Sequence, residues 1–381
     1  MSLLPARARR ALSRFYAMLM KELIQLGRDR VTLATMVSVP LMQLFLFGFA
    51  INTTPRDLPT AVLLQENSDV GRSILAALRN TAFFDIRKVA TSEAEVESLL
   101  RSGAVLFAIE IPAGFERALR RGETPAMLVS ADATDPVAAG SALAALEGVV
   151  HSALSRDRVT GVAPPAPPAF EIRQHRRFNP AGSSQLNIVP GLLGTILTMT
   201  MLIFTALSVT REVERGTMES LLAMPIRPLE IMLGKIAPYV VVGFLQATLI
   251  ISAGVFVFGV PMLGSLALLA ALSTLFIAAN LSIGYTFSTL AQNQLQAVQM
   301  AMMFFLPNIL LSGFMFPFAG MPVWAQWVGE CLPLTHYIRI VRGIMLKGSD
   351  LADLQQDGLW LAGLMLIAMT IAVRRFRQTL D

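Results

Sequence analysis

The stretch from Ser208 to Tyr239 reads S-V-T-R-E-V-E-R-G-T-M-E-S-L-L-A-M-P-I-R-P-L-E-I-M-L-G-K-I-A-P-Y and lies between two long hydrophobic runs. A segment this rich in ionised side chains cannot lie in hydrocarbon, so it must emerge into water between two membrane spans. Its charged residues fall within about seven helical turns: Arg211, Glu212, Glu214, Arg215, Glu219, Arg227, Glu230 and Lys235. Its apolar residues leave one face that a partner protein could accept: Val213, Met218, Leu221, Leu222 and Pro225. The pattern indicates a cytoplasmic coupling element over residues 210–235, although a solvated loop that merely joins two spans fits the periodicity equally well.

The composition is too apolar for a soluble protein of 381 residues. Hydrophobic residues make up 54% and charged residues 15% of the chain, against roughly 45–50% and 25% in ordinary globular proteins. The mean hydropathy of +0.59 indicates several membrane spans. The net charge of +5 does not indicate nucleic-acid binding, because the arginines cluster beside hydrophobic runs and no basic stripe is interleaved with aromatic residues.

Cysteine and histidine usage excludes two further kinds of site. The single cysteine, Cys331, rules out an intramolecular disulfide framework and a multi-cysteine metal site, and we expect it to be a small buried apolar residue. The three histidines, His151, His175 and His336, are widely separated and show no zinc-type spacing, so no metal site is predicted.

Hydrophobic runs divide the chain into a membrane part and an inserted domain. Residues 1–30 predict a cytoplasmic amphipathic helix in the membrane interface, with a soluble-facing helix as the alternative, and residues 31–51 predict the first transmembrane helix. Residues 186–381 predict a membrane domain of five further helices, at about 187–209, 236–259, 264–289, 296–316 and 356–373. The fold class is therefore a mainly α-helical polytopic membrane protein with six transmembrane helices and an extracytoplasmic α/β domain between the first and the second.

Basic residues set the orientation of this arrangement. With six spans, three basic clusters fall on one side of the membrane, which is therefore cytoplasmic and holds both termini. These clusters precede the first span, follow the second span and follow the last span: Arg7 to Arg30, Arg211 to Lys235, and Arg374 to Arg377. The chain is thus predicted to be a multi-pass membrane protein.

Residues 52–185 predict one compact α/β domain outside the membrane. Four apolar strands are expected at 60–64, 83–89, 105–111 and 126–131, with helices at about 69–80, 92–102, 113–121 and 136–158. Ser92 and Glu95 form a potential capping box, and Pro112 suits a first helical turn. Asp132 and Asp135 flank a turn, which is ordinary turn chemistry. No catalytic constellation is visible here, so the domain is interpreted as a binding or docking module.

The segment 317–348 is neither polar nor long enough to span the membrane cleanly. Pro317, Pro322 and Pro333 interrupt it, so it predicts a pair of short helices that re-enter from the outer surface, with an outer loop as the alternative. Trp324, Trp327 and Tyr337 suit an interfacial position.

The membrane spans lack the chemistry of an independent pump or enzyme. Secondary transporters usually bury ionisable residues near the midplane, whereas the polar residues in these spans are almost all neutral: Gln43, Gln246, Asn280, Gln299 and Asn308. No nucleophile–base pair of an intramembrane hydrolase and no phosphate-binding loop is present. If the protein pumps, the energy must come from another chain.

Three segments carry a resemblance to a known family. Residues 211–235, residues 178–191 (F-N-P-A-G-S-S-Q-L-N-I-V-P-G) and residues 306–322, which continue into 332–348, match in order and in the expected membrane positions. The chain resembles type-2 ABC transporter permeases of the bacterial multidrug-export kind over essentially its whole length. The resemblance implies partners: ABC ATPase subunits, a second permease copy in a homodimer or heterodimer, the lipid bilayer, and in some cases a periplasmic adaptor. It also implies that this chain binds no cofactor directly, with ATP and Mg on the partner ATPase, and that it is not itself an enzyme.

The resemblance implies two sets of functional residues. The ATPase-coupling residues, which seat in a groove of the ATPase, are Arg211, Glu212, Glu214, Arg215, Gly216, Thr217 and Glu219, with Pro225 ending the element. Methionines and aromatic residues could line an adaptable substrate pathway for amphiphilic compounds, although simple packing or lipid contact is an alternative: Phe276, Tyr285, Met300, Met302, Met303, Phe304 and Phe305. The contrasting function is a membrane-anchored extracytoplasmic sensor or docking scaffold without transport.

Overall fold

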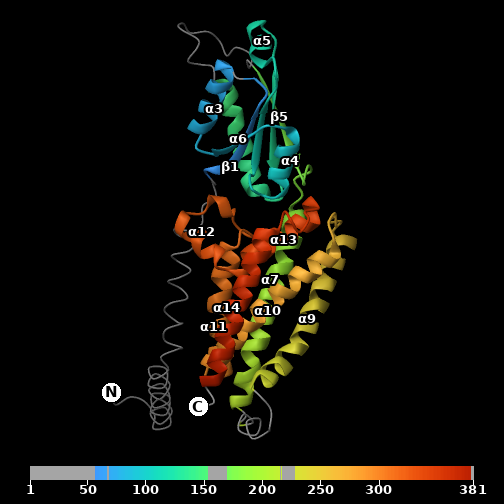
Figure 1. Ribbon diagram of the computed structural model, residues 1–381, viewed down its shortest axis with the longest axis vertical. Helices are drawn as coiled ribbons and strands as arrows, with labels where there is room; N and C mark the ends of the chain where they lie inside the picture. Colours follow the sequence, from blue (N-terminus) through green and yellow to red (C-terminus); the bar gives the residue numbers. More distant parts are fainter. Residues whose placement is uncertain (1–55, 67, 153–169, 215, 217–227, 379–381) are drawn as a thin grey trace, which may run out of the picture.

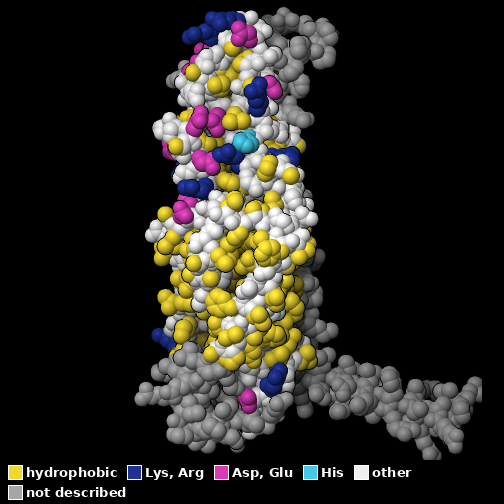
Figure 2. Space-filling view, turned by 90° about the vertical axis from the view of Figure 1, so that its right-hand side faces the viewer, with side chains coloured by type: hydrophobic (Ala, Val, Ile, Leu, Met, Phe, Trp, Pro, Cys, Tyr) yellow, Lys and Arg dark blue, Asp and Glu magenta, His cyan; other side chains and the backbone are white. Residues whose placement is uncertain are grey.

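The computed structural model describes residues 56–66, 68–152, 170–214, 216 and 228–378 (Figure 1). An α/β domain lies at one end of an elongated helical bundle, and the end of α7 lies at the opposite, distal end of that bundle (Figure 1). The predicted interfacial helix 1–30 and first transmembrane helix 31–51 lie outside the described residues. Hydrophobic side chains cover the visible face of the bundle, while charged side chains gather on the α/β domain (Figure 2).

A five-stranded mixed sheet forms the centre of the α/β domain. Its spatial order is β2-β1-β3-β4-β5, and all pairs are parallel except the antiparallel β3–β4 pair. The strands are β1 (Leu58–Leu64), β2 (Phe84–Ala90), β3 (Phe107–Ile111), β4 (Ala126–Asp132) and β5 (Glu171–Arg177). The four predicted strands are confirmed to within two residues at each end, but β5 was not predicted because E-I-R-Q-H-R-R has no apolar alternation.

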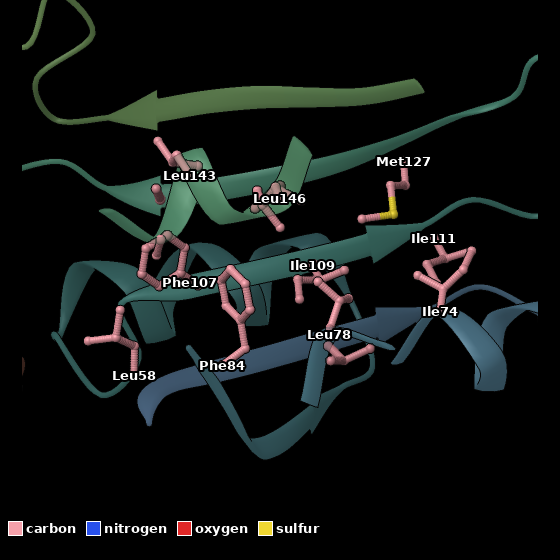
Figure 3. Packing of buried hydrophobic residues seen from close by; sticks show 14 of the residues in the cluster. Leu58, Ile74, Leu78, Phe84, Phe107, Ile109, Ile111, Met127, Leu143 and Leu146 are labelled. Atoms are coloured by element: carbon pink, nitrogen blue, oxygen red, sulfur yellow. The ribbon is translucent and has the colours of Figure 1, made fainter. Parts of the chain in front are cut away.

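Helices cover both faces of this sheet. Phe107, Ile109 and Ile111 point from β3 into one core with α3 (Asp69–Asn80) and α6 (Pro136–Ser152) (Figure 3). Ala108 points to the other face, where it packs with Val96 and Leu100 of α4 (Glu93–Arg101). The period of two along β3 therefore supplies both cores of the domain.

Side-chain caps fix where the helices of the domain begin. Ser92 Oγ accepts a hydrogen bond from the Glu95 amide at 3.2 Å, as the predicted capping box requires. The Glu95 carboxylate reaches back one residue further, to the amide of Thr91 at 2.8 Å. The start expected near Pro112 is wrong: α5 (Phe115–Arg120) begins after Gly114, whose φ of 79° suits glycine.

Five helices have the length and composition to cross a membrane among the described residues. They are α7 (Ser184–Glu214), α9 (Pro228–Phe256), α10 (Leu266–Leu290), α11 (Gln294–Leu311) and α14 (Gln355–Gln378). The predicted spans 187–209 and 356–373 lie within α7 and α14. The span expected at 264–289 begins two residues before α10, and the span expected at 236–259 runs three residues past the end of α9. The span expected at 296–316 ends earlier, because Ser312 caps the helix end and Gly313 turns the chain with a φ of 80°.

Short helices occupy the segment between α11 and α14. The prediction for 317–348 was a pair of such helices, and their re-entry from the outer surface stays a prediction. They are η3 (Phe318–Gly320), α12 (Val323–Glu330), α13 (Pro333–Arg342) and the π-helical η4 (Gly343–Lys347). Trp324 and Trp327 are exposed, which fits their predicted interfacial position. Cys331 is also exposed, so the expectation that it is buried is wrong.

Tyr337 departs from the predicted interfacial position because α13 packs among α7, α10 and α14. Its side chain is fully buried. Its ring stacks on that of Phe276 with centroids 3.9 Å apart, and its hydroxyl lies 2.7 Å from Ser273 Oγ. A buried tyrosine hydroxyl needs such a partner, and α10 provides it.

Candidate functional site

The described part of the predicted coupling element is the distal end of α7. Arg211, Glu212 and Glu214 lie in the last turn of this helix, which extends past the apolar span Ser184–Glu212. Gly216 follows with a φ of 69°, a left-handed conformation that favours glycine and fits the predicted helix break. The remaining predicted coupling residues, Arg215, Thr217, Glu219 and Pro225, lie outside the described residues.

Two pairs of residues tie this end of α7 to the end of α10 and the start of α11. The Thr210 amide donates to Ser288 Oγ at 3.0 Å, and Thr210 Oγ1 donates to the Ser288 carbonyl at 3.3 Å. Both residues are buried. One turn further on, Glu214 Oε1 accepts a hydrogen bond from the Gln294 amide at 2.6 Å, and Glu214 Oε2 accepts one from Gln294 Nε2.

The Gln294 contacts change the electrostatics of Glu214. The side-chain and backbone hydrogen bonds from Gln294 hold the pKa of the Glu214 carboxyl below its ordinary value. Gln294 is the first residue of α11, so the carboxylate lies where helix N–H groups have no intrahelical partner. Glu214, predicted as an ATPase contact, is therefore engaged within its own chain.

The predicted pathway residues of α10 are packing residues in this structure. Phe276 and Tyr285 are fully buried. Phe276 lies in the cluster that joins α7, α10 and α13, where it stacks on Tyr337. Neither side chain lines an open path here.

The pathway residues predicted on α11 lie in a different cluster from Phe276. Met300 and Phe304 are partly buried against a core that includes Leu202 of α7, and the ring of Phe304 lies 5.8 Å from that of Phe287. Met303 is 40% exposed. An open groove of about 290 Å³ instead runs along α14, and its lining residues are Gln356, Leu359, Trp360, Gly363, Leu364 and Ile367.

Sequence reasoning missed a polar cluster that joins α12, α13 and α14. His336 is fully buried; its Nδ1 lies 2.8 Å from Asp357 Oδ1, and its Nε2 lies 2.9 Å from the Glu330 carbonyl oxygen. Each ring nitrogen of His336 therefore has an oxygen atom of another residue within hydrogen-bond distance. Arg339 Nη2 also donates to Glu330 Oε1 at 2.6 Å. The sequence did contain one sign of this cluster: Asp357 is an acidic residue inside an otherwise apolar span, where it needs a polar partner.

A second missed cluster joins the α/β domain to the bundle. Lys347 Nζ donates to a carboxylate oxygen of Asp132, and it also donates to the Leu100 carbonyl at 3.2 Å. Arg101 Nε lies 3.2 Å from Asp353 Oδ2. Asp132 accepts from Thr134 in the turn expected from the sequence, but the prediction that it has only turn chemistry is wrong.

Comparisons with known proteins agree with this architecture. Residues 30–374 match the family described as ABC-2 family transporter protein. The chain is 31% identical to the probable multidrug ABC transporter permease YbhS of Escherichia coli, over 88% of this chain and 89% of the relative. It is 28% identical to the probable multidrug ABC transporter permease YbhR of the same organism, over 91% of this chain and 93% of the relative. The chain therefore belongs to the ABC-2 transporter family, as a type-2 ABC permease of the membrane.

Proposed function

We propose that this permease is the membrane subunit of an ATP-driven exporter that moves amphiphilic, drug-like or lipid-like compounds out across the bacterial cytoplasmic membrane. A separate pair of ABC ATPase subunits supplies the energy and carries ATP and Mg, and a second permease copy completes the transport path. Residues 31–51 would add one transmembrane helix before the five described ones, which gives six in total. Both termini would then lie in the cytoplasm and the α/β domain outside.

The observation that carries this proposal is the position of the charged end of α7. It lies at the distal end of the bundle, away from the α/β domain (Figure 1). Arg211 is exposed there, and Glu214 bonds to Gln294 at the start of α11. A partner that binds this end could transmit force to three spans at once, because α7 packs against both α10 and α11.

Two supports concern the transported compound. The relatives YbhS and YbhR are both described as probable multidrug permeases. Methionine and phenylalanine side chains of α11, including the 40% exposed Met303, offer a polarizable surface that can adapt to varied apolar cargo.

Capture of the ATPase tests the coupling role. The intact protein, in detergent, is compared with a variant that carries Glu212→Arg, Arg215→Glu and Glu219→Arg. We expect the variant to recover at least about tenfold less ATPase, the factor that 1.4 kcal/mol of binding free energy represents. The matched control reverses the exposed pair Asp85–Arg87 on the α/β domain and should recover as much ATPase as the unaltered protein. Equal recovery by all three proteins would sink the proposal.

Transport itself is tested on the reconstituted complex. Addition of an amphiphilic compound should raise ATP hydrolysis by the permease–ATPase complex in vesicles, and labelled compound should leave the side on which ATP is hydrolysed. A sensor or scaffold without transport would bind its ligand without either effect.

A further inference from the structure

We propose that Glu214 is a positioning residue that joins the ATPase-coupling end of α7 to the start of α11, rather than a contact of the ATPase surface. The inference rests on the proposed coupling function and assigns a mechanical role to one residue of that site. It comes from a single juxtaposition: the Glu214 carboxylate meets both the amide and the side chain of Gln294, which is 80 residues away in the sequence.

The geometry of this contact uses both carboxylate oxygens. Oε1 accepts from the Gln294 main chain at 2.6 Å, and Oε2 accepts from the Gln294 side chain. A carboxylate at a helix N-terminus binds orphan N–H groups and interacts favourably with the helix dipole. Charge-assisted hydrogen bonds of this kind are roughly twice as strong as neutral ones. The contact therefore holds the first residue of α11 against the last residue of α7 in a defined orientation.

A second contact makes the Glu214–Gln294 contact, called here the joint between α7 and α11, rigid. Thr210 lies one helical turn before Glu214 and bonds to Ser288 near the end of α10. The connection from α10 to α11 is short, and side chains cap its α11 end. Asn293 Oδ1 accepts from the Gln296 amide at 2.8 Å, and Gln296 Oε1 accepts from the Gln292 amide at 2.9 Å. Displacement of the α7 end must consequently displace the α10–α11 turn as a unit.

The joint connects the coupling end to the proposed cargo surface. Gln294 begins the helix that carries Met300, Met303 and Phe304. When the ATPase subunits move the end of α7, α11 shifts with it, and the side chains of Met300, Met303 and Phe304 shift as well. Loss of the joint should leave ATPase binding intact and uncouple it from cargo.

Charge exchange across the contact tests this assignment. Gln294→Glu places two carboxylates face to face, whereas Gln294→Glu combined with Glu214→Gln restores a carboxylate–amide pair with the groups exchanged. The single variants, the double variant and the unaltered protein are each reconstituted with the ATPase. Two quantities are measured: the ATPase captured in detergent, and the factor by which an amphiphilic compound stimulates ATP hydrolysis.

We expect capture to stay constant in all four proteins. Stimulation should fall about tenfold in Gln294→Glu, equivalent to about 1.4 kcal/mol, and should recover in the double variant. Two results would overturn the proposal. One is loss of capture in Glu214→Gln with none in Gln294→Glu, which would make Glu214 an ATPase contact. The other is a double variant no better than Gln294→Glu.

A cross-link separates failure of this inference from failure of the proposed function. In a Cys331→Ser background, Glu214→Cys and Gln294→Cys should react together with a short bifunctional maleimide. Absence of the cross-link in folded protein overturns the joint itself. Formation of the cross-link by a protein that captures no ATPase preserves the contact but overturns its role in coupling, together with the proposed function.

Discussion

Lys347, the last residue of η4, forms a buried ion pair with Asp132, the last residue of β4, across 215 residues of sequence. The ammonium group also lies 5.3 Å from the centre of the Phe178 ring. This pair, with the bond from Ser349 Oγ to the Arg101 carbonyl at 3.3 Å, fastens the α/β domain to the helices that follow α13. A rearrangement of α13 and α14 would therefore also move the α/β domain.

Removal of one partner from this pair should loosen the domain. Lys347→Met leaves the Asp132 carboxylate buried without its cation, so we expect the free energy of unfolding to fall by about 3–5 kcal/mol. Thermal unfolding in detergent measures the change, and limited proteolysis should show earlier cleavage between the α/β domain and the bundle. Arg72→Met is the matched control, because the Arg72–Asp69 pair is exposed and should contribute less than about 1 kcal/mol. Equal melting temperatures for the two variants would contradict the buried-pair interpretation.

The His336 cluster should depend on the charge of Asp357. Asp357→Asn removes the carboxylate next to His336 Nδ1 and leaves Arg339 with Glu330 as its ion-pair partner. This change should cost about 1–3 kcal/mol of stability. Thermal unfolding at neutral pH checks this value. Asp350→Asn, at an exposed position before α14, should not change the melting temperature. A loss of equal size in both variants would show that the buried cluster has no special role.

The crossing of α7 and α10 should not accept a side chain at Gly284. A Cβ there would lie 2.1 Å from Thr205 Oγ1 and 2.8 Å from the Leu202 carbonyl oxygen. Because backbone atoms cannot move aside cheaply, Gly284→Ala should cost about 1–3 kcal/mol through overpacking. Gly363→Ala on α14 is the control, since no atom lies within 4 Å of its added Cβ. Unchanged stability of Gly284→Ala in a detergent melt would disprove the close approach of the two helices.

The start of α5 should respond to acid through Glu66. Its carboxylate accepts from the amides of Gly114 at 2.7 Å and Glu116 at 3.1 Å, and these bonds hold the pKa of Glu66 below its ordinary value of 4.5. The stabilisation is therefore complete above pH 4.5 and is lost as the pH falls through the lowered pKa of the folded protein. Glu66→Gln should flatten the dependence of the melting temperature on pH below this value.

A control separates Glu66 from general acid effects. Glu123 is an exposed carboxylate just beyond α5, and Glu123→Gln should leave the acid dependence as it is in the unaltered protein. Parallel pH profiles for Glu66→Gln and the unaltered protein would show that the cap does not contribute.

Local patterns in the sequence were enough to locate most elements. The apolar runs that became α7, α9, α10 and α14 were visible from length and hydropathy, because a span must satisfy its backbone internally over about twenty residues. Four strands and the Ser92 cap were also visible, since their signals are periodicity and short-range hydrogen bonds. The density of charged residues in 211–235 was enough to predict the coupling element from the sequence.

Contacts between distant segments escaped the same reasoning. β5 forms an edge strand without apolar alternation, and Tyr337 is buried because α13 lies between α7, α10 and α14 rather than at the surface. The predicted pathway residues Phe276 and Met300 lie in separate packed clusters. In each case the deciding neighbour comes from another element, and hydropathy along the chain contains no information about it.

The sequence alone determined that this protein is a multispan membrane protein with a charged element between spans, because burial in lipid and exposure to water impose strong constraints on each local segment. Only the tertiary structure decided which polar groups meet. Lys347 bonds to Asp132, His336 contacts Asp357, and Glu214 bonds to Gln294. These pairings depend on how helices and strands pack in three dimensions, and a buried charge such as that of Lys347 must take the partner that the fold brings within hydrogen-bond distance.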